Sequence, residues 1–253
     1  MSLSDTLPIA LVGYGTTGKE IERLAERYDC EVRQIFTSRR PLDGASDAEM
    51  NFEVAIDFSV PSATLGNARF LAARGKAVVL GATGWYSAEA MKELEEIIHR
   101  ADGSLVWGTN FSVGVQILNR LARRAAEEIA RFEEYDIALH ELHHARKIDA
   151  PSGTALTLAK ILQEALPRRK TEILAETSRG RIPSATLHVS STRVGDTPGT
   201  HTLYIDSPAD TIEITHRARN RSGFAAGALR AAHWARRHKG VKEFSEIFDD
   251  LER

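Results

Sequence analysis

The order of apolar runs in the first half of the chain constrains the fold more than any other feature. Short runs separated by segments of helical periodicity predict strands at Ile9–Gly13, Val32–Phe36, Val54–Phe58, Ala77–Leu80 and Ser104–Trp107. Repeated strand–helix–strand order predicts a parallel sheet with helices on both faces. Because ligands bind at the carboxyl ends of such strands, we expect a binding site at that edge of the sheet.

A glycine-rich turn directly follows the first of these strands. It reads Gly13-Tyr14-Gly15-Thr16-Thr17-Gly18 and leads into a helical pattern. A G-x-G-x-x-G turn in this context is typical of dinucleotide-binding proteins, because glycines let the backbone approach a pyrophosphate and the helix N-terminus attracts its charge. A tight turn without a ligand is the alternative. Two more glycine-bearing turns, beginning at Gly81 and Gly108, also follow predicted strands.

The end of the second predicted strand bears on which dinucleotide is used. Sites that prefer NAD usually carry an acidic residue about 20 positions beyond the glycines, where it binds the ribose 2′-OH. This chain has Thr37-Ser38-Arg39-Arg40 there and no carboxylate. Because guanidinium groups bind phosphate bidentately, we expect Ser38 and Arg39 to suit a 2′-phosphate, and NADPH to be used at least as well as NADH. Solvated loop arginines are the alternative.

The pattern changes from Tyr135 onward, which indicates a second domain. Strands are predicted within Ala185–Val194, His201–Asp206 and Thr211–His216, whereas the polar stretch 167–183 reads as a long loop. We therefore predict an α/β protein with a Rossmann-type parallel-sheet domain over residues 1–113. A second, α+β domain over residues 114–221 would have a mostly antiparallel open sheet. The helices expected within 222–253 would pack back on the first domain.

The letters HELHH at positions 140–144 match the H-E-x-x-H pattern of zinc proteases. Those enzymes need both histidines on one face of a helix. Residues 135–139 alternate between apolar and polar, which favours a strand, and on a strand positions i and i+4 lie ~13 Å apart, too far to share one zinc ion. Periodicity alone leaves a helix open, but the cations Arg146 and Lys147 disfavour a metal beside them. No metal is expected.

The residues that follow form a candidate anion site. A turn from Asp149 leads into a predicted helix, so Ser152, Gly153 and Thr154 fall where free backbone N–H groups gather. The cationic candidates His143, His144 and Lys147 lie just upstream on the same loop. Cations beside a helix N-terminus oppose its dipole, and an anion bound between them would offset that cost.

The run His143-His144-x-x-Lys147-x-Asp149-Ala-Pro-Ser-Gly-Thr154 closely resembles the signature of the 4-hydroxy-tetrahydrodipicolinate reductases, long called dihydrodipicolinate reductases. The glycine turns, Asn110–Gly114, Ile214–His216 and Arg221-x-x-Phe224 match in order. The resemblance implies a Rossmann domain and a substrate domain whose sheets assemble into a homotetramer. It also implies reduction of a cyclic, imine-type dicarboxylate by NADH or NADPH, in lysine and diaminopimelate biosynthesis.

The resemblance implies roles for single residues as well. His143 resembles the family's proton donor and acceptor and Lys147 its second proton donor, while His144, Gly153 and Thr154 fall where substrate binds. We add the hydroxyl of Ser152 to the substrate site. The dinucleotide would lie along three turns, which consist of Gly13, Tyr14, Gly15, Thr16, Thr17 and Gly18, of Gly81, Ala82 and Thr83, and of Gly108, Thr109, Asn110 and Phe111.

The chain departs from the family pattern where the cofactor would bind. Many members have a glycine turn one residue longer, with Arg-Met where this chain has Thr16-Thr17, and an acid where it has Ser38-Arg39. Many also have Gly-Thr-Thr-Gly in place of Gly81-Ala82-Thr83-Gly84. These departures leave the preference between NADH and NADPH open, but not the reaction. The role of Arg221 is open too.

The residue types are consistent with this chemistry. Hydride delivery to an electron-poor ring carbon leaves electron density that a proton must quench, and an imidazole with pKa ~6.5 can supply that proton near neutral pH. Two alternatives remain: another two-domain nicotinamide dehydrogenase, such as an aspartate or homoserine dehydrogenase, and a non-catalytic NAD(P) sensor. Neither needs the loop that carries His143, His144 and Lys147.

Charge and composition limit the partners. A net charge of −2 provides no general attraction for nucleic acid or anionic lipid, and no apolar run approaches the length of a membrane span. The N-terminal residues lack a signal-peptide pattern, and the single cysteine, Cys30, fits a reducing compartment. We expect a cytoplasmic enzyme that acts on a small molecule.

Overall fold

The computed structural model describes residues 6–175 and 180–251. The chain divides into two compact units. Unit 1 comprises Met1–Val113 and Arg221–Arg253, and unit 2 comprises Gly114–Asn220. Within the described ranges, no helix is both long enough and apolar enough to cross a membrane.

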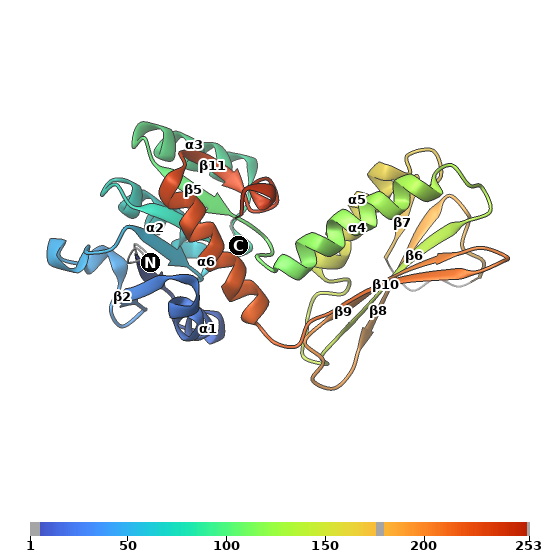
Figure 1. The fold of residues 1–253 in the computed structure, drawn as a ribbon, viewed down its shortest axis with the longest axis horizontal. Helices are drawn as coiled ribbons and strands as arrows, with labels where there is room; N and C mark the ends of the chain where they lie inside the picture. Colours follow the sequence, from blue (N-terminus) through green and yellow to red (C-terminus); the bar gives the residue numbers. More distant parts are fainter. Residues whose placement is uncertain (1–5, 176–179, 252–253) are drawn as a thin grey trace, which may run out of the picture. The chain divides into compact units, whose positions relative to one another are not determined.

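Unit 1 is built on a six-stranded parallel sheet with the order β11-β5-β4-β3-β1-β2 (Figure 1). Its strands are β1 (Leu7–Val12), β2 (Cys30–Phe36), β3 (Val54–Asp57), β4 (Ala77–Leu80), β5 (Ser104–Trp107) and β11 (Gly240–Glu243). Every neighbouring pair runs parallel, as the alternating pattern predicted. The edge strand β11 was not predicted, because four residues that include a lysine and a glutamate carry no clear strand signal.

Helices cover both faces of this sheet because its strands are apolar on both sides. They are α1 (Thr16–Ala25), α2 (Thr64–Ala72), α3 (Ala88–Arg100) and α6 (Ser222–Arg237), with short 3-10 turns at Glu26–Tyr28, Leu42–Gly44, Asp47–Glu49, Pro61–Ala63 and Phe248–Asp250. Alternate residues of β1 enter different cores. Ile9 and Leu11 pack with α1 and α6, whereas Ala10 and Val12 pack with α2 and α3.

Unit 2 is a five-stranded sheet with the order β10-β9-β6-β8-β7 and two helices on one face (Figure 1). Its elements are α4 (Val113–Ile129), β6 (Asp136–His143), α5 (Gly153–Ala165), β7 (Glu172–Leu174), β8 (Thr186–Arg193), β9 (Thr200–Asp206) and β10 (Thr211–Arg217). The apolar core lies between the helices and the sheet, where Leu118 and Leu158 from the helices meet Leu139, Leu187 and Leu203 from the strands.

The sheet of unit 2 is mixed rather than mostly antiparallel. β6 runs antiparallel to β9 but parallel to β8, and β7 is parallel to β8. The path from β6 to β8 passes through α5, a crossover long enough to return the chain in the same direction. β7 lies inside the stretch 167–183 that was predicted to be a loop, because three strand residues among polar neighbours give no periodic signal. Residues 176–179 of that stretch lie outside the described part of the chain.

Candidate active site

The glycine-rich turn lies where the strand order of unit 1 reverses. β1 has β2 on one side and β3 on the other, so its carboxyl end is the switch point at which doubly wound sheets bind ligands. Gly13 has φ +86°, and a Cβ on it would lie 2.7 Å from the Phe58 carbonyl oxygen. A Cβ on Gly18 would lie 2.5 Å from the Gly13 carbonyl oxygen, so α1 begins pressed against the strand end. These glycines place the N-terminus of α1 at the switch point, which suits a phosphate.

A cavity of about 380 Å³ opens over this turn. It brings together two of the predicted turns, Gly15–Gly18 and Gly81–Thr83, with four residues that were not assigned to the cofactor: Phe58, Ser59, Pro61 and Arg221. The Nη1 of Arg221 donates to the Thr17 hydroxyl at 3.3 Å. Arg221, whose role the sequence left open, therefore belongs to the wall of this cavity.

The third predicted turn follows β5 but does not line the cavity. Phe111 is 1% exposed, and its ring packs against Phe58 and Phe244 at centroid distances of 5.9 and 4.7 Å. Its side chain is therefore part of the core, and any contact with a ligand on this turn falls to the more exposed Thr109 and to Asn110. The side chain of Tyr14 does not line the cavity either, and its hydroxyl donates to the carboxylate of Glu22.

Ser38 and Arg39 form the exposed tip of a tight turn at the end of β2. The turn is closed by two backbone hydrogen bonds, of 2.9 and 3.0 Å, between Thr37 and Arg40. Arg40 is an ion-pair partner of Glu49 at 2.5 Å and also donates to the Gln34 side chain at 2.7 Å. Of the two guanidinium groups in this stretch, that of Arg40 is thus engaged within the protein.

In unit 2 the first four residues of the HELHH stretch, His140–His143, lie on strand β6, as predicted, and His144 follows the strand end. Along β6, side chains from Ile137 to His143 alternate between the helix-covered face and the open face. Glu141 and His143 face the helices and are 0% and 7% exposed. His140 points to the other face, where its Nδ1 lies 2.9 Å from the Ser190 hydroxyl. The two histidines of the H-E-x-x-H pattern are not one turn apart on a helix, so the zinc-protease interpretation is wrong.

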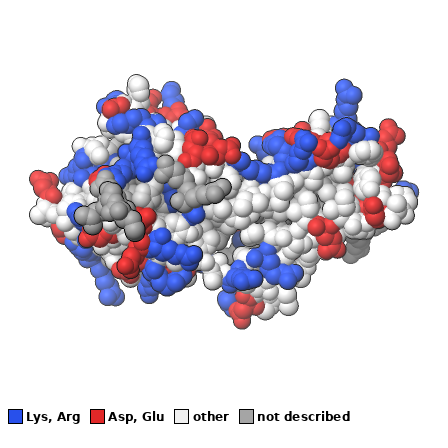
Figure 2. Space-filling model, in the orientation of Figure 1, with Lys and Arg blue, Asp and Glu red and all other residues white. Residues whose placement is uncertain are grey.

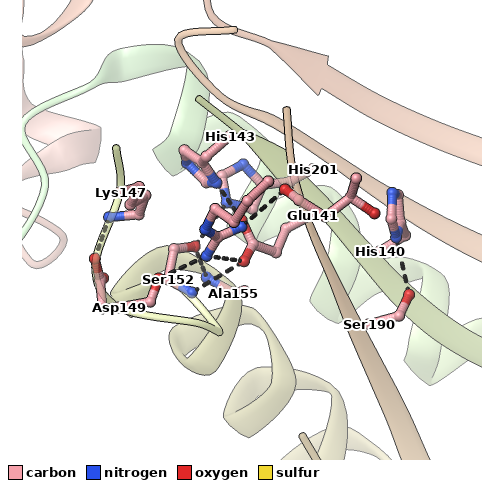
Figure 3. A network of polar contacts seen from close by, with 11 residues as sticks. His140, Glu141, His143, Lys147, Asp149, Ser152, Ala155, Ser190 and His201 are labelled. Atoms are coloured by element: carbon pink, nitrogen blue, oxygen red, sulfur yellow. Dashed lines mark hydrogen bonds and ion pairs between the residues drawn. The ribbon is translucent and has the colours of Figure 1, made fainter. Parts of the chain in front are cut away.

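A polar network centred on Glu141 is buried at the carboxyl end of β6 (Figure 3). One carboxylate oxygen, Oε2, accepts from Nδ1 of His143. The other, Oε1, accepts from the guanidinium of Arg193 at 2.7 Å and from the backbone N–H of Ser152 at 3.2 Å. Burial works against ionisation of this carboxyl group, but Arg193 and His143 hold its pKa below the ordinary value.

His143 is enclosed by groups from three strands. Its ring meets the ring of His201 edge-on, with centroids 5.2 Å apart, and a Cβ on Gly199 would lie 2.8 Å from its Nε2. Burial lowers the pKa of His143, while the Glu141 carboxylate raises it, and Lys147 and Arg193 lower it again. Burial also lowers the pKa of His201, to about 4, so this second imidazole is neutral at physiological pH.

The turn before α5 is ordered by the same network. Ser152 is 3% exposed, and its hydroxyl accepts from the Ala155 amide and lies 3.2 Å from Nε2 of His201. Because its hydroxyl and its amide are both engaged within the protein, we expect Ser152 to orient the turn rather than to touch an anion. Gly153 is exposed beside it, at the first turn of α5.

Lys147 and His144, the two remaining residues predicted for the substrate site, differ in their hydrogen bonding. The Lys147 ammonium pairs with Asp149 at 2.7 Å, and its side chain is 23% exposed. Nδ1 of His144 is buried without a hydrogen-bond partner among the described residues. An unpaired buried nitrogen is costly, which suits a group that bonds to a ligand.

Glu141, His143 and His201 have the atom types of a metal site, with ligand atoms within 4.8 Å of one another. The geometry argues against that use. Both oxygens of Glu141 already accept hydrogen bonds, one of them from the guanidinium of Arg193. A fixed cation beside the carboxylate repels a second one, so the cluster suits proton chemistry better than metal binding.

Several residues of the site were not found from the sequence. The proximity of Glu141 to His143 could have been predicted, because residues two positions apart on a strand lie on the same face. Arg193, Gly199 and His201 carried no local signal. They reach His143 only because β8 and β9 pair with β6 on its two sides.

Comparison with known proteins identifies the family. Residues 7–111 match the model of the dihydrodipicolinate reductase N-terminus, and residues 114–248 match that of its C-terminus. The chain belongs to the dihydrodipicolinate reductase family. Its relatives include the 4-hydroxy-tetrahydrodipicolinate reductase of Christiangramia forsetii, 35% identical over 96% of this chain and 98% of that protein. The reductase of Desulfovibrio desulfuricans is 42% identical over 72% of this chain and 69% of that protein.

Solved structures agree at the level of the fold. Dihydrodipicolinate reductase from Paenisporosarcina sp. TG-14, determined with dipicolinate bound, superposes with a TM-score of 0.77 at 19% identity, covering 96% of this chain and 99% of that one. An engineered D-amino acid dehydrogenase bound to NADP+ reaches 0.53 at 16% identity, over 95% and 94% of the two chains. The predicted family, fold class and enzyme class are confirmed, and the sensor and the other dehydrogenases are set aside. The chain is a nicotinamide-dependent oxidoreductase of lysine and diaminopimelate biosynthesis.

Proposed function

We propose that this dihydrodipicolinate reductase reduces 4-hydroxy-tetrahydrodipicolinate to tetrahydrodipicolinate, with uptake of a hydride and a proton and loss of the 4-hydroxyl group as water, and that His143 is the proton-carrying residue. The observation that carries the proposal is the bond between Nδ1 of His143 and the buried carboxylate of Glu141, which leaves Nε2 as the atom that can exchange a proton with substrate. An imidazole held in one orientation near neutral pH is an effective general acid.

The substrate's carboxylates would bind at the start of α5. The first turn of α5 contains no acidic residue, and the amides of Gly153 and Thr154 lie at its positive end. The unpaired Nδ1 of His144 can supply a further hydrogen bond. Lys147 would neutralise charge and act as the second proton donor. It would have to exchange its present ion pair with Asp149 for the substrate.

The glycine turns of unit 1 fit a dinucleotide. The cavity over Gly15–Gly18 and Gly81–Thr83, with Arg221 in its wall, offers backbone amides and a cation to a pyrophosphate. The reduced nicotinamide, when bound, supplies the hydride. Ser38 and Arg39 would meet a 2′-phosphate, so we expect NADPH to serve at least as well as NADH.

We also infer a homotetramer assembled through the open face of the unit 2 sheet. Ala138, His140, Leu142 and Tyr204 are only partly buried there in the single chain, and α4 and α5 cover the opposite face. Light scattering on the purified protein tests this directly. The single cysteine fits the cytoplasmic location that we infer for this biosynthetic step.

The deciding experiment is a coupled assay. The product of dihydrodipicolinate synthase is supplied as substrate, and the loss of near-ultraviolet absorbance is followed with NADPH and NADH in turn. Substrate-dependent oxidation of the cofactor is expected with both. If neither cofactor is oxidised by the folded protein, the proposed reaction is wrong.

A further inference from the structure

The buried carboxylate of Glu141 joins three segments of unit 2. It bonds to His143 on its own strand, to Arg193 on β8, and to the backbone of Ser152 at the start of α5. Glu141 is 0% exposed, and the side chain of Arg193 is 17% exposed. A carboxylate so far from water is stable only when its charge is compensated, and the guanidinium compensates it.

Arg193 holds the other end of the same turn. Its Nη2 donates to the Asp149 carbonyl oxygen at 2.5 Å, while Glu141 accepts from the Ser152 amide three residues further on. Both ends of the turn from Asp149 to Ser152 are therefore attached to one ion pair. The carboxylate of this ion pair also accepts a hydrogen bond from Nδ1 of His143 (Figure 3).

We propose that Glu141 and Arg193 form a positioning pair for the reduction. The pair keeps His143 in the tautomer that carries hydrogen on Nδ1, so that Nε2 exchanges the proton, and it holds the substrate-binding turn in register with that nitrogen. This inference rests on the role proposed for His143. The pair would act through His143 and the turn and not by contact with the substrate.

Charged and titratable groups face His143 from every strand that adjoins it. Glu141 lies on β6, Arg193 on β8 and His201 on β9, and Lys147 follows β6 on the loop. Burial lowers the pKa of His143, as do Lys147 and Arg193, and Glu141 opposes them. Removing the negative charge of Glu141 would therefore lower this pKa further.

The principal test is Glu141→Gln. A glutamine side chain keeps the shape, but its amide can present an N–H to Nδ1 and so favour the opposite tautomer. We expect kcat to fall about 10²-fold or more, with the KM for NADPH unchanged, because the cofactor cavity belongs to unit 1. The descending limb of the pH–rate profile, where His143 loses its proton, should move to lower pH. A merely structural role would lower kcat without moving that limb.

Glu164→Gln is the matched control. Glu164 pairs with Arg123 at 3.0 Å in the same unit, but this pair is exposed, at 49% and 46% for the two side chains. We expect the kcat and the pH–rate profile of Glu164→Gln to match those of the wild type. A folded Glu141→Gln enzyme with the wild-type kcat and pH profile would overturn the proposal.

Two further measurements distinguish failure of the positioning-pair proposal from failure of the role proposed for His143. Imidazole ¹⁵N chemical shifts of the wild-type protein report the tautomer of His143 even if Glu141→Gln does not fold, with the resonance assigned by its loss in His143→Gln. Hydrogen on Nδ1 is expected, and a neutral ring with hydrogen on Nε2 would overturn the positioning pair. An active His143→Gln variant would instead show that the proposed function of His143 is wrong.

Discussion

Gly199 lies against the proton-carrying edge of His143, where a Cβ would come within 2.8 Å of Nε2. Glu141 bonds to the other ring nitrogen, Nδ1. Glu141 prevents the imidazole from turning away, and Gly199, with φ +150°, leaves Nε2 room to bind and exchange a proton. Glu141 and Gly199, which are far apart in the chain, thus together leave the Nε2 edge of the His143 ring accessible.

Replacing Gly199 by alanine is therefore expected to impair catalysis. The added methyl would push against the His143 ring, which its bond to Glu141 holds in place, and displacement of a catalytic group by about 1 Å can cost 10²-fold in rate. We expect kcat to fall by about that factor while NADPH binding is retained. Gly195→Ala is the control: Gly195 has φ +52° in the same β8–β9 connection, but a Cβ on it would meet nothing within 4 Å. Equal losses in both variants would show that backbone strain, and not crowding of His143, is responsible.

Replacing His143 by glutamine should lower turnover by about 10²–10⁴-fold, the usual contribution of a general acid. Affinity for NADPH should not change, because the cavity that would hold it is formed by unit 1 residues alone. Steady-state kinetics measure the first quantity and fluorescence titration with NADPH the second. Wild-type turnover in the variant would remove His143 from the chemistry.

Arg39→Gln tests the cofactor preference. Loss of one charge-assisted hydrogen bond to a 2′-phosphate should raise the KM for NADPH roughly tenfold and leave the KM for NADH unchanged. The control is Arg33→Gln, since Arg33 is an exposed residue of β2 that pairs with Glu31 at 3.0 Å. If Arg39→Gln changes the two constants equally, Arg39 does not bind the 2′-phosphate.

The buried His201 should make unit 2 less stable in acid. Its pKa is lowered by burial from 6.5 to about 4, so between these values the unfolded chain binds a proton that the folded chain does not. Its contribution to stability is therefore fully present above pH 6.5 and is lost as the pH falls toward 4, with a total on the order of 3 kcal/mol. Urea unfolding at a series of pH values measures this dependence.

The slope of unfolding free energy against pH should be smaller in His201→Gln than in the wild type. His99→Gln, which alters an exposed histidine on α3, serves as the comparison and should keep the wild-type slope. An unchanged slope in His201→Gln would show that His201 is not the group that titrates on unfolding.

Local sequence patterns determined much of this protein. Alternation of apolar runs was enough for the parallel sheet of unit 1, because strand and helix periodicities are properties of neighbouring residues. The same reasoning placed HELHH on a strand and the turn at Ser152 before a helix, and the His143–Thr154 motif identified the family. The parallel pairing of β8 with both β6 and β7, in contrast, is not encoded in any local period.

Only the tertiary structure decided what surrounds His143. Arg193 lies 52 positions from Glu141, and His201 lies 49 positions from Ser152, yet each pair is in hydrogen-bond contact. These contacts exist because β6 pairs with β8 on one side and β9 on the other. Strand order depends on packing over the whole unit, so no window of sequence could show which arginine would neutralise Glu141, or that a glycine would face Nε2.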